Sequence, residues 1–276
     1  MTAQGVINTE RDNAAGREID TERHSVLDGK VTLHQDTSGS HRAGLDAVML
    51  AASVSGDARH VVDLGAGVGS AGLCVAARLS HIKVTLVENN PVMIALAQQT
   101  LDDPDNAQFN ERVSLLAADI TLRGDERIHA GLITNMADCV IMNPPYWEGE
   151  TVRPSPNDDR ASAHILGEEG LAPWFRTASA ILKSNGTLCV IFPAKRLDDL
   201  FDEMKGRFGD ITLMPLYKGD NEEASRIIVR AKKASRAPMK IVPGLVLHEE
   251  KTKDATRREW TKRASAILKG EASLFI

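Results

Sequence analysis

The chain has 276 residues, of which 42% are hydrophobic and 26% are charged, and its formal net charge is −5. This composition is typical of an ordinary globular protein. It contains no run of about 18 apolar residues, which excludes a membrane-spanning helix. Three scattered cysteines exclude a disulfide framework, and the polar first thirty residues show no secretory signal. These features predict a cytoplasmic protein.

The charge changes sign along the chain. Residues 225–276 contain 13 basic and 5 acidic residues, a net of +8, so the preceding 224 residues carry −13. Six cations between positions 226 and 240 have no acidic residue among them, namely Arg226, Arg230, Lys232, Lys233, Arg236 and Lys240. Such a cluster is typical of a surface that binds a polyanion.

The N-terminal part contains few elements. Residues 1–25 lack apolar periodicity and are predicted to be a flexible extension, followed by a single domain over residues 26–276. Val26–Leu33 is expected to form a short strand or hairpin arm. Leu45–Ala52 has apolar residues at helical spacing and predicts a helix.

From residue 60 onward, short apolar strands alternate with amphipathic helices. The expected strands are His60–Leu64, Lys83–Val87, Val113–Ala117, Cys139–Met142, Thr187–Phe192, Ile211–Leu216 and Arg226–Arg230. The expected helices are Ser70–Leu79, Pro91–Leu101, Leu171–Leu182 (closed by Asn185-Gly186), Arg196–Met204 and a final Thr256–Leu268. Near-continuous apolar strands favour burial on both faces, so the pattern predicts an α/β fold of the Rossmann-like, doubly wound type, with a mostly parallel sheet.

A glycine-rich turn follows the first of these strands, in the sequence Asp63-Leu64-Gly65-Ala66-Gly67-Val68-Gly69-Ser70. Glycines allow a ligand to approach the backbone, and the helix start supplies free N–H donors. Ser70 stands where the dinucleotide fingerprint has its third glycine. Glu88 ends the next strand, where a carboxylate can accept both hydroxyl groups of a ribose.

The sequence Asn143-Pro144-Pro145-Tyr146 directly follows the apolar strand Cys139–Met142. Two prolines fix an extended path and remove two donors, so the turn presents the Asn143 side-chain oxygen and the Pro144 carbonyl as acceptors. Two acceptors suit a planar NH₂ group that is to be methylated, because they stabilise the positive charge that develops on its nitrogen. Tyr146 offers a face on which a flipped-out base can stack.

Together these motifs resemble class I S-adenosylmethionine-dependent methyltransferases that act on amino groups, which have a seven-stranded sheet. The resemblance implies S-adenosylmethionine as cofactor and S-adenosylhomocysteine as product. It implies cofactor contacts from Asp63, Gly65, Ala66, Gly67, Glu88, Asp119 and Asn143, with Glu88 on the ribose and Asp119 on the adenine amine.

The segment before the glycine turn narrows the resemblance. Gln35, the run from Ser40 to Ala51 and the ending Leu245–Glu249 are similar to the bacterial tRNA(Val) adenine N6-methyltransferases. This resemblance implies that Arg42 and Asp46 help to close the cofactor pocket, and that the substrate is RNA, with tRNA as the expected partner. The six cations of residues 226–240 would then bind RNA phosphates.

Other functions remain open at this stage. They are a glutamine N5-methyltransferase acting on a protein, a guanine N2-methyltransferase, and a non-catalytic protein that binds S-adenosylmethionine or RNA. The His and Cys residues do not cluster at ligand spacing, so no metal site is expected. The oligomeric state and the contacts of the long segment 147–170 are not predicted. Trp174, Phe175 and the three cysteines are expected in the core.

Overall fold

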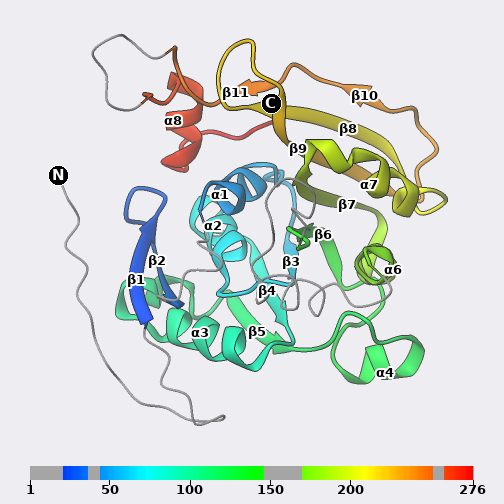
Figure 1. Ribbon diagram of the computed structural model, residues 1–276. Coiled ribbons are helices and arrows are strands. Elements are labelled where there is room, and N and C mark those ends of the chain that lie inside the picture. Colours follow the sequence, from blue (N-terminus) through cyan, green and yellow to red (C-terminus); the bar gives the residue numbers. More distant parts are fainter. Residues whose placement is uncertain (1–20, 37–43, 146–169, 251–257, 276) are drawn as a thin grey trace, which may run out of the picture.

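The computed structural model describes residues 21–36, 44–145, 170–250 and 258–275. They form a central sheet with helices on both faces (Figure 1). The nine strands follow the order β10-β8-β9-β7-β6-β3-β4-β5, with β11 also paired to β8. Their bounds are β3 His60–Leu64, β4 Lys83–Glu88, β5 Val113–Ala117, β6 Ala137–Met142, β7 Leu182–Pro193, β8 Phe208–Tyr217, β9 Ala224–Lys233, β10 Lys240–Ile241 and β11 Leu245–Val246.

The predicted doubly wound topology is confirmed. Strands β7, β6, β3, β4 and β5 are parallel neighbours, and β9 is antiparallel to both β7 and β8. All seven predicted strands are present, and two short strands that were not predicted, β10 and β11, run parallel to β8. Two-residue strands give no periodic signal in a sequence, which is why only the structure reveals them.

Two buried clusters explain the apolar strands. One cluster lies on the sheet face covered by α1 (Leu45–Ala52), α2 (Ser70–Arg78) and α8 (Lys262–Leu268). The other lies on the face covered by α6 (Ala172–Ile181) and α7 (Leu197–Met204), with α4 (Gly124–His129) beside it. Adjacent β6 residues alternate between the clusters, and Val140 and Ile141 have no exposed surface. The prediction that this strand is buried on both faces is therefore confirmed.

Expectations for Trp174, Phe175 and the cysteines are also confirmed, because all five side chains are buried. Two helix boundaries were wrong. The helix of residues 171–182 ends at Ile181, since Leu182 already pairs with Ala137 and begins β7, so Asn185-Gly186 lies within the strand span. The final helix begins at Lys262, because the Thr261 hydroxyl accepts a hydrogen bond from the Ala264 N–H and caps it there.

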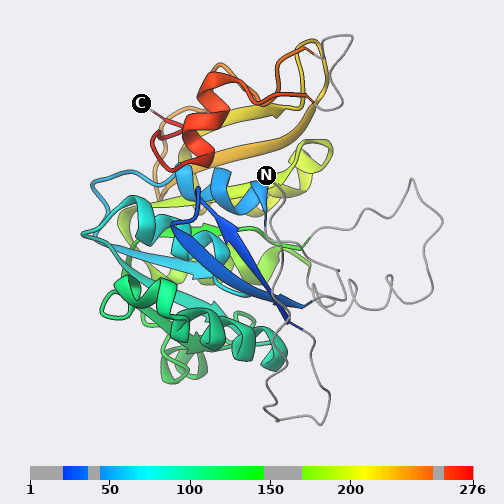
Figure 2. The ribbon, with the colours of Figure 1, turned by 90° about the vertical axis from the view of Figure 1, so that its left-hand side faces the viewer.

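A two-stranded hairpin, β1 (Thr21–Val26) and β2 (Val31–Asp36), packs beside α3 (Pro91–Asp102) and the short helix η1 (Pro104–Phe109). The prediction of a flexible extension over residues 1–25 was wrong for residues 21–25, which pair with β2. Residues 1–20 lie outside the described ranges. Figure 2 shows the hairpin, in dark blue, crossing in front of the sheet.

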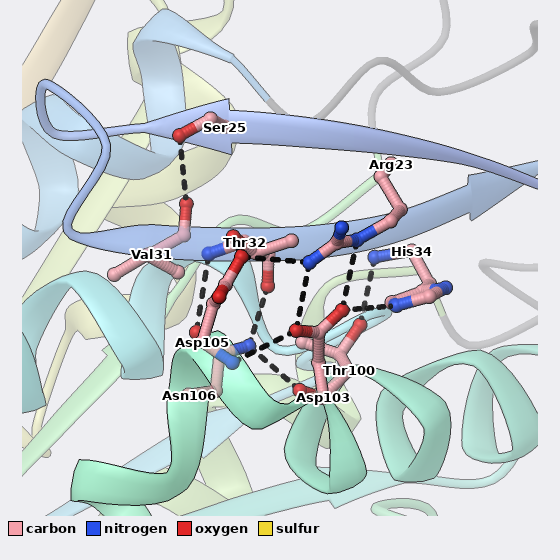
Figure 3. A network of polar contacts seen from close by, with 9 residues as sticks. All are labelled: Arg23, Ser25, Val31, Thr32, His34, Thr100, Asp103, Asp105 and Asn106. Atoms are coloured by element: carbon pink, nitrogen blue, oxygen red, sulfur yellow. Dashed lines mark hydrogen bonds and ion pairs between the residues drawn. The ribbon is translucent and has the colours of Figure 1, made fainter. Parts of the chain in front are cut away.

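A polar network fixes this hairpin (Figure 3). The buried carboxylate of Asp103 accepts hydrogen bonds from the Arg23 guanidinium at 2.9 and 3.0 Å and lies 2.7 Å from Nε2 of His34. The Asn106 side chain accepts a hydrogen bond from the Thr32 N–H and donates one to the Thr32 carbonyl. Although burial opposes it, hydrogen bonds from His34, the Asp105 N–H and Arg23 lower the pKa of Asp103. The network anchors β2 to the end of α3 and to η1.

Candidate active site

The glycine loop between β3 and α2 is built from backbone conformations that favour glycine. Gly65, Gly67 and Gly69 have φ angles of 66°, 57° and 89°. At Gly65, an added Cβ would lie 2.3 Å from the Trp174 ring, whereas at Gly67 it would meet no atom within 4 Å. The loop is therefore packed against the core on one side and open at Gly67.

Asp63 lies beneath this loop. Its side chain is 3% exposed, and Oδ2 accepts a hydrogen bond of 2.8 Å from the N–H of Gly72 in the first turn of α2. Burial, together with the negative charge of Glu88, raises the pKa of Asp63 to about 7, although the Gly72 N–H opposes the shift. The carboxylate thus caps α2 from within the core.

Glu88 contacts the glycine loop directly. Its Oε2 accepts a hydrogen bond of 2.8 Å from the Gly67 N–H, and its Oε1 accepts bonds of 2.9 Å from the N–H groups of Asn89 and Asn90. An ionised carboxylate has about four acceptor positions, so one remains for a ligand hydroxyl. The side chain is half-buried at the edge of the sheet.

Asp119 lies two residues after the end of β5 and is half-buried. Its Oδ1 accepts a hydrogen bond of 2.7 Å from the Thr121 N–H, which fixes the turn and leaves Oδ2 for a ligand. The Ala118 N–H donates to the Glu88 carbonyl at 3.0 Å, so the two acidic residues occupy the same edge.

The Asn143-Pro144-Pro145 turn leaves β6 at this edge. Met142 pairs with Leu64, so Asn143 follows β6 at the same level at which Gly65 follows β3. Asn143 is exposed, while Pro144 is buried and Pro145 half-buried. The prolines therefore anchor the turn in the protein, and Asn143 is its exposed residue.

The order β6-β3-β4-β5 places the site residues in one row. Asn143, Gly65 and Asp119 follow the carboxyl ends of β6, β3 and β5, and Glu88 is the last residue of β4. At about 4.8 Å between strands, the row extends over roughly 14 Å. This is the edge at which open α/β sheets bind ligands.

These residues fit the expected cofactor. The open space over Gly67 and the remaining acceptors on the Glu88 and Asp119 carboxylates form an acidic cradle, which suits the hydroxyl groups and the positive charge of the cofactor. In addition, the buried Ser70 hydroxyl in the first turn of α2 has no hydrogen-bond partner among the described residues. Nothing in the sequence indicated an unsatisfied Ser70 hydroxyl or a Trp174 wall at Gly65, since both depend on how the chain packs.

Arg42 and Tyr146 lie outside the described residues. Asp46, in the first turn of α1, forms an ion pair of 2.9 Å with Nε of Arg226 on β9, and both side chains are about one quarter exposed, at 23% and 25%. Asp46 therefore joins α1 to β9, near the level of Pro193 at the end of β7.

The six predicted cations do not form one surface. On β9, Arg226, Arg230 and Lys232 face the cluster that contains Ile228, whereas Lys233 points to the opposite face. There its Nζ donates to the Leu182 carbonyl at 2.6 Å, and burial lowers its pKa. Lys232 lies six residues, or about 20 Å, from Arg226 along the strand. Arg236 and Lys240 are exposed beyond it.

No three His, Cys, Asp or Glu side chains come together as a metal site within the described ranges. In the same part of the chain, no helix is long and apolar enough to cross a membrane.

A doubly wound sheet with a glycine loop after β3, an acidic residue at the end of β4 and another after β5 defines a Rossmann-like methyltransferase of class I. The sequence profile described as "Methyltransferase small domain" matches residues 44–216, and the chain belongs to this family. The chain is 35% identical to the solved protein Atu636 of Agrobacterium tumefaciens, described as a predicted O-methyltransferase. That alignment covers 83% of this chain and 97% of Atu636, with a TM-score of 0.70.

Curated relatives include proteins named tRNA1(Val) (adenine(37)-N6)-methyltransferase. The chain is 28% identical over 153 residues to that of Flavobacteriaceae bacterium strain 3519-10, covering 55% of this chain and 59% of the relative. It is 28% identical over 171 residues to that of Porphyromonas gingivalis strain W83, covering 59% of this chain and 63% of the relative. The relative from Dyadobacter fermentans is 24% identical over 210 residues, covering 75% of this chain and 82% of the relative. The chain thus spans less than two thirds of the first two relatives.

Proposed function

We propose that this protein transfers a methyl group from S-adenosylmethionine to the exocyclic N6 amine of an adenine in RNA, with a tRNA as substrate. The observation that carries the proposal is the anchored turn Asn143-Pro144-Pro145, which presents an exposed amide beside the glycine loop. The names of the curated relatives support adenine in tRNA as the acceptor.

The open side of the loop at Gly67, Glu88 and Asp119 would hold the cofactor. S-adenosylmethionine, when bound, supplies a methyl group activated by its sulfonium. The Asn143 side-chain oxygen and the Pro144 carbonyl would accept the two amine hydrogens and hold the nitrogen in line for attack. Their dipoles stabilise the charge that develops on nitrogen, and the proton then leaves to solvent. Tyr146 would stack on the base.

An amine acceptor fits this site better than a hydroxyl. A hydroxyl group needs a base that removes its proton, and an asparagine amide cannot ionise. An exocyclic amine can be methylated before it loses a proton, because acceptors on its two hydrogens draw the nitrogen toward tetrahedral geometry and the alkylated nitrogen becomes acidic. The description of Atu636 as a predicted O-methyltransferase makes the acceptor atom a direct question for experiment.

For RNA binding we propose electrostatic attraction by the basic segment 226–240, with two of its members in a reduced role. Arg226 is paired with Asp46, and Lys233 packs on the opposite face of the sheet. Arg230, Lys232, Arg236 and Lys240 are the cations that we expect to increase the affinity for RNA. A tRNA substrate places the protein in the cytoplasm.

The test compares wild type, Asn143→Ala and the control Asn110→Ala, an exposed asparagine at the end of η1. Each is incubated with labelled S-adenosylmethionine and unmodified tRNA, and digested RNA is analysed by mass spectrometry. We expect N6-methyladenine with wild type and Asn110→Ala, and a loss of about 100-fold or more for Asn143→Ala with cofactor binding retained. Label on a hydroxyl, on guanine or on protein glutamine would overturn the proposal, as would an active Asn143→Ala variant.

A further inference from the structure

A cavity of about 520 Å³ opens on the α8 face of the sheet, far from the glycine loop. It is bordered by the start of β8, the end of β9, β10 and the C-terminal segment after α8. Thr187 and Lys232 are paired across the cavity floor, and Thr187 is level with Cys139, whereas Asn143 lies beyond the carboxyl end of β6. The volume is within the range of small-molecule sites, about 300–1,000 Å³.

The described lining is strongly positive. It contains four cations, Arg230, Lys232, Lys240 and Arg263, and a single carboxylate, that of Asp210. Lys240 lies 3.8 Å from Asp210, which offsets one charge. The exposed Asp57 nearby has a lowered pKa, chiefly through a hydrogen bond from Ser55, and the charges of Lys232 and Arg230 contribute. The cavity therefore retains an excess of positive charge.

Three of these cations are held by groups that do not neutralise them. Lys232 donates to the Thr187 hydroxyl at 2.8 Å, and Arg263 donates to the Leu274 carbonyl at 2.7 Å. The Arg230 guanidinium lies 4.7 Å from the centre of the Phe275 ring. Side chains that are already fixed lose little entropy when an anion binds, so these three cations are prepared for a ligand.

An apolar wall completes the cavity, formed by Met214, Val242, Pro243, Leu274 and Phe275. A bare inorganic anion would leave this wall in water. A ligand that combines a phosphate with a flat ring would contact both the cationic side and the apolar side of the cavity. Cations bind the phosphate, and a base can pack on apolar and aromatic side chains.

We propose that this cavity binds a nucleotide, with its phosphate among Arg230, Lys232, Lys240 and Arg263 and its base against the apolar wall. The nucleotide comes either from solution or from an RNA chain. The RNA source rests on the proposed function, whereas the free nucleotide does not.

The first arm titrates AMP into the protein by calorimetry, with S-adenosylhomocysteine present to occupy the cofactor site. We expect saturable AMP binding that weakens at least tenfold in Lys232→Ala/Arg263→Ala and in Lys240→Glu, whose side chain is 61% exposed and tolerates replacement. The control Lys205→Ala removes a cation, 79% exposed and paired with Asp202, and should bind AMP like wild type. Adenosine should bind far more weakly than AMP.

The second arm measures binding of unmodified tRNA to the same variants. If the cavity variants bind tRNA more weakly than wild type, and AMP competes with tRNA for the wild type, the cavity binds a nucleotide of the RNA. If the variants bind AMP weakly but tRNA normally, the cavity binds a free nucleotide. Unchanged affinity for both AMP and tRNA in folded cavity variants would overturn the proposal. Because Asn143→Ala should bind AMP normally, a failure of methyl transfer is distinguished from a failure of this cavity.

Discussion

The carboxyl edge of β3–β6 presents mainly backbone groups and short side chains, whereas the β8–β9 side presents long cationic side chains. At the edge, strand register places Asn143, Gly65 and Glu88 side by side, and the Gly67 N–H holds the Glu88 carboxylate against the glycine loop. On β9, alternate residues face opposite sides, so Lys232 and Lys233 diverge although they are neighbours in sequence. Adjacent positions in a sequence therefore form one site only when secondary structure brings them to one face.

The largest expected effect concerns the charge buried under the edge. With its pKa raised to about 7, Asp63 gives stability that is fully present below the ordinary value near 3.8 and is lost as the pH rises through about 7. Asp63→Asn removes this loss. Between pH 4 and pH 8, the wild type should therefore lose up to about 4 kcal/mol of unfolding free energy that Asp63→Asn keeps.

Denaturant unfolding at several pH values measures this shift. Asp138→Asn is the control of opposite sign: although burial opposes it, hydrogen bonds from Lys183 and from the His60 and Arg59 N–H groups lower the pKa of Asp138. Its stabilising contribution is present above its ordinary pKa and is lost as the pH falls. Parallel pH profiles for wild type and Asp63→Asn would show that the edge carries no buried charge.

The second prediction separates the packed and open sides of the glycine loop. Gly65→Ala combines a positive φ with a contact of 2.3 Å to Trp174, and should cost about 3 kcal/mol of stability. Gly67→Ala has the φ strain alone, about 1 kcal/mol, but its methyl group enters the open space. We expect Gly67→Ala to weaken S-adenosylmethionine binding about tenfold or more, measured by calorimetry, while thermal melting ranks Gly65→Ala as the less stable. Full cofactor affinity in Gly67→Ala would exclude a cofactor over the loop.

The smallest effect concerns the ion pair of Asp46 and Arg226, which joins α1 to β9. A double-mutant cycle with Asp46→Asn and Arg226→Gln should give a coupling energy of about 1 kcal/mol in urea unfolding. If Asp46 acts through Arg226, both single variants change cofactor affinity equally. A loss of affinity in Asp46→Asn alone would instead make Asp46 a direct cofactor contact.

Much of the carboxyl edge was predictable because its signals are local. The glycine turn, Glu88 and the Asn-Pro-Pro run are each encoded within a few residues, and apolar strands predict a buried parallel sheet that aligns their ends. The inward position of Asp63 was not predictable, since its bond to Gly72 depends on how α2 returns over β3. The same holds for the Trp174 ring at Gly65, which comes from a helix more than 100 residues later.

The distribution of charge shows what can be learned from the sequence and what requires the tertiary structure. The sequence by itself determined that 13 of its cations are concentrated in the last 52 residues, because composition needs no structure. Only the tertiary structure decided what they face: Asp46 holds Arg226, the Leu182 carbonyl holds Lys233, and four cations from β9, β10 and α8 meet around one cavity. The physical reason is that electrostatic partners are set by distance in space, and strand alternation and long-range packing determine that distance.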